Sequence, residues 1–181
     1  MADNLEHAYE LSLVLRSQLG DEAAFEELLK LHSPRLRFFF GRMLGSRQQG
    51  AEDLLQDVWL TAYRSLPKLE DAGAFRSWIF SIARARVCRE FRRAKVEFQQ
   101  LDEFERDELA AEEDPDATVD AEAVRMKVEA LAPEHREALL LRFVEDMSYE
   151  EIAQVTGTAL GTVRSRIHYA KRALRRAMEG K

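Results

Sequence analysis

The spacing of apolar residues constrains the fold of this chain most strongly. Along almost the whole sequence these residues recur at intervals of three and four, the repeat of an amphipathic α-helix. A half-buried strand would need alternating apolar and polar residues, and no convincing segment of that kind is present. The sequence therefore predicts an all-α protein. Its 181 residues allow one large domain or two small ones, and the distribution of charge favours two.

Local signals place four helices in the first half of the chain. Gly20 and Gly45 are expected to end the first two helices, and Asp21 to cap the second. Pro67 marks the exit from the third helix. The expected helices cover residues 5–19, 22–44, 51–65 and 75 to about 93.

A pair of short helices is predicted between residues 148 and 174. Ser148 and Glu151 have the spacing of a capping box, and Gly157 supplies the left-handed conformation that ends the first helix. Thr158 is then expected to cap the next helix. In that helix the buried stripe is predicted to consist of Val163, Ile167, Ala170 and Leu174.

This pattern is typical of a helix-turn-helix that reads DNA. If the apolar stripe faces the core, then Arg164, Ser165, His168 and Lys171 face outward. Side chains of these types can reach base edges or phosphates when such a helix enters the major groove. Two ordinary amphipathic helices of a bundle would show similar spacing, so the alternative stays open at this point.

Charge is unevenly distributed along the chain. The formal net charge is -6, yet residues 100–123 contain eleven acids and one arginine, so the rest of the chain is positive. The positive surplus lies in residues 84–95 and 164–176. We therefore predict two small domains, 1–95 and 121–181, joined by an acidic flexible linker over residues 96–120. About 25 residues of extended chain could span roughly 80 to 90 Å.

The linker suggests two hypotheses. Its acids could compete with DNA for the basic helices and so weaken DNA binding by the free protein. Residues 101–109 could instead form a short amphipathic helix that packs on one domain.

Enzymatic and metal-binding motifs are missing from the sequence. Cys88 is the single cysteine, and the four histidines are scattered without the spacing of a metal site. There is no glycine-rich phosphate loop and no nucleophile elbow. We therefore expect no catalytic residues, cofactor or metal. With no long apolar run and no visible signal segment, we expect a cytoplasmic protein that does not insert into membranes.

Two helices carry charged faces of opposite sign. In the helix 51–65, an acidic face made of Asp53, Gln56 and Asp57 also contains Leu60, which suggests a basic protein partner as an alternative to a merely solvated face. In the helix from residue 75, Arg86, Arg89 and Arg93 form a basic ridge suited to DNA phosphates. The alternative to DNA contact is that these cations only interact favourably with the C-terminal end of the helix.

Together these segments resemble the extracytoplasmic-function (ECF) sigma factors, the smallest class of promoter-specificity subunits of bacterial RNA polymerase. GDEAAFEELL, AEDLLQDVWLTAYRSL and AFRSWIFSIARARVCREFRR are similar to the second conserved region of this family. The stretch from LAPEHREALLL to RSRIHYAKRAL is similar to its fourth region. The resemblance implies a region 2 helical bundle in residues 1–95 and a region 4 helix-turn-helix in residues 121–181.

The resemblance also implies roles for individual residues. Core polymerase would bind Asp53, Leu54, Gln56 and Asp57. The minus-ten element would be recognised and melted by Lys68, Arg84, Arg86, Arg89, Arg92 and Arg93. The minus-thirty-five element would be read by Arg164, Ser165, His168 and Lys171. The family's usual IARN motif reads IARA here, with Ala85 in place of an asparagine that often contributes to minus-ten recognition.

The implied function is promoter-specific initiation of transcription without catalysis by this chain. Its partners would be core RNA polymerase and promoter DNA, and an anti-sigma factor is a further candidate, since many members of the family are held inactive by one. Two other functions fit parts of the sequence: a stand-alone helix-turn-helix regulator, and a sigma mimic that binds an anti-sigma factor and never touches promoters.

Overall fold

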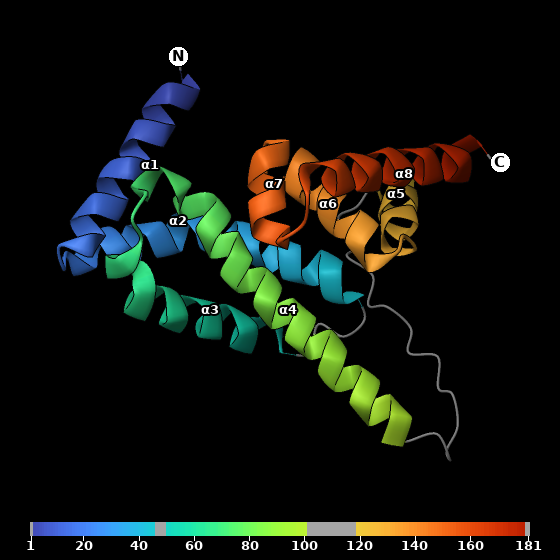
Figure 1. Ribbon diagram of the computed structural model, residues 1–181, viewed down its shortest axis with the longest axis horizontal. Coiled ribbons are helices and arrows are strands. Elements are labelled where there is room, and N and C mark those ends of the chain that lie inside the picture. The colour runs from blue at the N-terminus through green and yellow to red at the C-terminus, as the bar shows by residue number, and fades with distance from the viewer. Residues whose placement is uncertain (1, 46–49, 101–118, 180–181) are drawn as a thin grey trace.

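The protein is built from α-helices and short 3-10 turns (Figure 1). The computed structural model describes residues 2–45, 50–100 and 119–179, and no strand occurs within them. The helices are α1 (Ala2–Gln18), α2 (Glu22–Leu44), α3 (Ala51–Ser65), α4 (Phe75–Gln100), α5 (Val119–Glu129), α6 (Pro133–Phe143), α7 (Tyr149–Thr156) and α8 (Leu160–Glu179). Two 3-10 turns, η2 (Leu66–Lys68) and η3 (Ala72–Ala74), connect α3 to α4. The predicted all-α fold is confirmed.

Helices α1 to α4 form the first domain. Its core includes Phe39 and Phe80, whose rings meet edge to face with centroids 5.5 Å apart. Asp21 caps α2 as predicted, because its carboxylate accepts a hydrogen bond from the Ala24 amide at 3.0 Å. Gly45, with a positive φ of 57°, ends this helix. The buried indole of Trp59 donates to the Ser33 hydroxyl at 3.0 Å, so its polar atom is satisfied.

Helices α5 to α8 form the second domain. The capping box at the start of α7 is confirmed: the Glu151 amide donates to the Ser148 hydroxyl, and the Ser148 amide donates to the Glu151 carboxylate. Gly157 ends α7 in the left-handed conformation. The prediction that Thr158 caps α8 is wrong. Its hydroxyl is hydrogen-bonded to that of Thr156, and the amides of Thr162 and Val163 donate to the carbonyl of Ala159.

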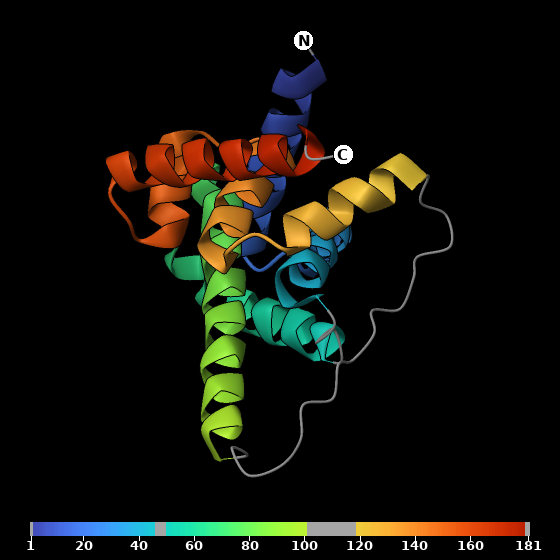
Figure 2. The same ribbon diagram turned by 90° about the vertical axis from the view of Figure 1, so that its right-hand side faces the viewer.

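The two domains pack directly on each other. Helix α4 contacts α7, and α2 contacts α6. One continuous apolar core joins Phe39 and Phe80 of the first domain to Leu141 and Ile152 of the second. Figures 1 and 2 show that the first half of α4 lies beside α7, whereas its second half projects away from the other helices.

Helix α4 is also longer than the sequence indicated. It continues to Gln100, beyond the expected end near residue 93 and past the proposed domain boundary at residue 95. Residues 101–118, which make up most of the proposed linker and include the possible amphipathic helix, lie outside the described residues.

Candidate nucleic-acid interface

The acidic face of α3 is exposed. Asp53, Gln56 and Asp57 point to solvent, and Leu60 is 47% exposed beside them. Leu54 differs from the other candidates for polymerase binding, because it is only 9% exposed and belongs to the core. Helix α3 therefore presents the apolar side chain of Leu60 within an acidic surface, as the spacing predicted. The side chain of Leu54 lies beneath that surface, in the core.

Arg86 connects this acidic face to α4. Its guanidinium donates to the Thr61 hydroxyl at 2.7 Å, and its Nε lies 3.7 Å from the Asp57 carboxylate. The Arg86 side chain is 25% exposed, whereas the Asp57 side chain is 61% exposed. Arg86 is thus held against α3 by one hydrogen bond and one ion pair, while the Asp57 side chain remains largely exposed.

The remaining arginines of the basic ridge are more open. Arg89, Arg92 and Arg93 are all exposed. Together with Leu54, Asp57, Arg86 and Glu90 they line a groove of about 680 Å³ between α3 and α4. The fold therefore places Leu54 and Asp57, two candidates for polymerase binding, across one groove from four arginines that are candidates for minus-ten contact.

Arg84 has a different environment from the ridge. Its Nε lies 2.9 Å from the carboxylate of Glu137, a residue of α6 in the second domain that is only 4% exposed. Burial raises the pKa of the Glu137 carboxyl, and the neighbouring Arg84 opposes that rise. Arg84 is consequently engaged across the domain boundary. Nothing local in the sequence signals this contact, which joins residues far apart in the chain.

The connection between α3 and α4 presents Lys68 to solvent. Two hydrogen bonds from the Gln18 amide, to the carbonyls of Leu66 and Leu69, fix η2 against α1. Asp71 accepts a hydrogen bond from the Gly73 amide at 2.9 Å and so shapes η3. The loop is therefore ordered by local and tertiary contacts while its cation remains exposed.

The four residues of α8 proposed to read DNA share one exposed face. Arg164, Ser165, His168 and Lys171 are all exposed, opposite the buried Val163 and Ile167. Two of them have internal partners: the Ser165 hydroxyl donates to the carbonyl of Gly161, and Lys171 lies 4.7 Å from the ring centroid of Phe143.

One further polar residue shares the exposed start of α8. Thr162 is exposed in its first turn, where residues of a recognition helix meet base edges. The sequence analysis did not include Thr162 among the candidates for DNA contact. Its position two residues before Arg164, at the start of the same helix, could have indicated it.

Within residues 2–45, 50–100 and 119–179, no three His, Cys, Asp or Glu side chains are grouped so that they could hold a metal ion. In the same ranges no helix is long and apolar enough to cross a bilayer.

Comparison with known proteins agrees with this geometry. Residues 28–96 match the family described as Sigma-70 region 2, and residues 121–174 match Sigma-70, region 4. The chain belongs to the ECF class of the sigma-70 family. Sigma factors are transcription initiation factors that recognise promoters. In this sigma factor, α3 and most of α4 lie in the region 2 match, and α6 to α8 lie largely in the region 4 match.

Relatives support the assignment over most of the chain. The sigma factor is 33% identical to RNA polymerase sigma factor CarQ of Myxococcus xanthus, covering 86% of this chain and 90% of the relative. It is 30% identical to the ECF RNA polymerase sigma-E factor of Escherichia coli K12, covering 90% of each. Identity to ECF sigma factor SigE of Mycolicibacterium smegmatis is 34%, but the chain spans only 63% of that relative.

The fold is also similar to a solved sigma factor. The sigma factor RpoE from Bartonella quintana, in complex with the anti-sigma factor NepR, aligns with a TM-score of 0.74 and 28% identity. The alignment covers 86% of this chain and 96% of the other. It spans both domains.

Proposed function

We propose that this sigma factor binds core RNA polymerase through the exposed face of α3 and contacts promoter DNA through α4 and α8. The observation that carries the proposal is the groove between α3 and α4. Leu54 and Asp57 of α3 line one side of it, and the arginines of α4 line the other. A single domain can therefore hold a protein partner and a nucleic acid at once.

The proposed role of each side chain follows from its exposure and its contacts. Asp53, Gln56 and Asp57 meet the polymerase, with Leu54 packed beneath them. Arg89, Arg92, Arg93 and Lys68 contact the minus-ten region, and the exposed face of α8 reads the minus-thirty-five element. Phosphate contacts position the chain and base contacts give it specificity.

Arg86 has a positioning role in this scheme. Its contacts with Asp57 and Thr61 hold the polymerase-binding face of α3 against the DNA-binding helix. The chain itself catalyses no bond formation, acts in the cytoplasm, and lends sequence specificity to the polymerase.

An anti-sigma factor is a further proposed partner. The solved relative from Bartonella quintana was captured with one, and the exposed apolar and charged surfaces of α3 offer a similar protein a place to bind.

Asp57→Arg tests the proposed polymerase contact. Fluorescence titration of core RNA polymerase should show tight binding of the wild-type chain and at least a tenfold loss for the variant, because the substitution reverses the charge at the centre of the acidic face. Glu26→Arg makes the same charge change at an exposed position of α2 and should bind as the wild type does.

The outcome separates the candidate functions. Equal binding by both variants would contradict docking through α3. Absence of binding by a folded wild-type chain would favour the stand-alone regulator or the sigma mimic, neither of which needs polymerase.

A further inference from the structure

The turn η2 receives hydrogen bonds from a residue that lies 48 positions before it in the chain. The side-chain amide of Gln18, at the end of α1, donates to the carbonyl of Leu66 at 3.1 Å and to that of Leu69 at 2.7 Å. The Leu69 amide also donates to the Leu66 carbonyl, at 3.0 Å. A primary amide carries two N–H donors, so one side chain can hold both ends of the turn. Pro67 and Lys68 lie between the two carbonyls.

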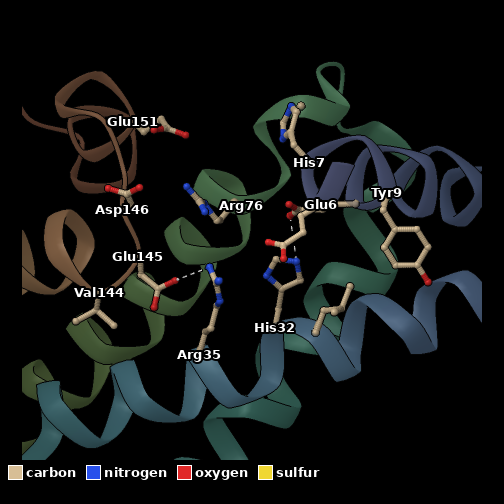
Figure 3. A pocket seen from close by; sticks show the side chains of 13 residues that line it. Glu6, His7, Tyr9, His32, Arg35, Arg76, Val144, Glu145, Asp146 and Glu151 are labelled. Carbon is tan, nitrogen blue, oxygen red and sulfur yellow. Dashed lines mark ion pairs between the residues drawn. The ribbon is translucent and has the colours of Figure 1, made fainter. Parts of the chain in front are cut away.

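Helix α1 gives this donor a fixed position. Leu13 and Val14 of α1 are buried in the core of the first domain. The Glu10 carboxylate lies 3.0 Å from the Nε2 of His32, a buried residue of α2, and this contact is the dashed line at His32 in Figure 3. Apolar packing and a polar contact therefore both tie α1 to α2, and Gln18 reaches the turn from a helix that is held in place.

Close packing holds only part of the turn. The side chain of Leu66 is 1% exposed and anchors the start of η2, whereas Pro67 and Lys68 are exposed. A cavity of about 190 Å³ lies beside the turn, and its lining includes Gln18, Tyr63 and Pro67. The residues after Leu66 thus have room to move on this side, and the hydrogen bonds from Gln18 restrain them.

The family match assigns no role to Gln18. The region 2 match begins at residue 28, so the turn η2 lies within it and Gln18 lies before it. The contact therefore links a residue outside the matched region to a turn that carries Lys68, a candidate for minus-ten contact.

We propose that Gln18 is a positioning residue for the opening of promoter DNA. From α1 it holds η2 in the conformation that presents Lys68 to the minus-ten region, and it makes no DNA contact of its own. A turn that is already ordered loses less conformational entropy when it binds DNA, which favours binding. The proposal rests on the role in minus-ten contact that is proposed above for Lys68.

The first test measures the order of the turn in the full chain without DNA or polymerase. Gln18→Met keeps the length of the side chain, removes both donors and changes no charge. In hydrogen exchange followed by nuclear magnetic resonance, the Leu69 amide should exchange about fivefold faster in this variant. The control is Ser12→Ala, which removes a donor from the same helix whose acceptor is the Tyr9 carbonyl. Equal exchange of Leu69 in the two variants would overturn the proposal.

The second test measures promoter opening by the reconstituted holoenzyme. The DNA is a promoter fragment that the wild-type holoenzyme selects from a random-sequence library, and permanganate reactivity of unpaired thymines reports opening. Gln18→Met should open this DNA about threefold more slowly than wild type, with unchanged affinity for core polymerase. In a Lys68→Ala background the same substitution should have little further effect, because Gln18 acts through the turn that carries Lys68. Losses that simply add would indicate a general loss of structure and overturn the positioning role.

These outcomes separate the role of Gln18 from the proposed function. A folded wild-type chain that does not bind core polymerase would contradict both. Equal opening rates for wild type and Gln18→Met would contradict the role of Gln18 alone. Circular dichroism shows whether each variant is folded. If Gln18→Met does not fold, Gln18→Glu takes its place, because glutamate has the shape of glutamine and its carboxylate can only accept hydrogen bonds.

Discussion

At the residue scale, the arginines of α4 divide by their partners. Arg84 and Arg86 are partly buried and lie beside the carboxylates of Glu137 and Asp57. Arg89 and Arg92 are exposed, although Arg92 also donates to the carbonyl of Cys88. Arginines of the same helix therefore differ in how many of their hydrogen-bond donors remain available to DNA. Helical spacing alone does not show which arginines are paired with a carboxylate.

Arg164→Ala provides a residue-scale test of promoter reading. If Arg164 makes a bidentate contact to a guanine, the substitution should cost about 1 to 3 kcal/mol at one promoter position. Binding of the reconstituted holoenzyme to a set of single-base promoter variants measures this loss. A loss that is equal for every sequence would identify a phosphate contact instead, as expected for the control Arg172→Ala farther along α8.

At the element scale, the start of α2 depends on a charged cap. The Ala24 amide and then the Arg16 guanidinium hold the pKa of the Asp21 carboxyl below its ordinary value. A lowered pKa means that the ionised carboxylate stabilises the folded chain above the unfolded-state pKa. This stabilisation is lost as pH falls through the folded-state pKa.

Asp21→Ser tests this dependence. Serine keeps an acceptor at the cap but removes the charge. In urea unfolding, the difference in the free energy of unfolding between wild type and variant should be largest above about pH 4 and should shrink toward pH 2. A difference that stays constant over this range would assign the role of Asp21 to hydrogen-bonding geometry alone.

At the scale of the whole molecule, the acids of residues 102–116 support a hypothesis about DNA binding. We expect these acids to attract the two basic helices over a long range and so to compete with DNA, and salt should screen this attraction. Replacing the acids of residues 102–116 with Gln or Ser should raise the affinity of the free chain for promoter DNA at low salt. The effect should disappear at high salt, and unchanged affinity at low salt would contradict the hypothesis.

Whole-molecule packing also explains where the sequence analysis was incomplete. The expected position of Asp57 on an exposed face was correct because helical spacing fixes which side chains share a face. The burial of Leu54 beside it depends on how α3 packs against neighbouring helices, which spacing does not specify. The partner of Arg84 was unpredictable for the same reason.

The sequence by itself determined the helices and many of their ends. Ala51–Ser65 was predicted with its observed bounds, and the Ser148 capping box and the Gly157 terminus were read correctly, because such signals act between residues a few positions apart. Only the tertiary structure decided that the two domains close on each other. That closure joins Arg84 to Glu137 through burial and charge compensation between segments distant in sequence, which no local pattern encodes.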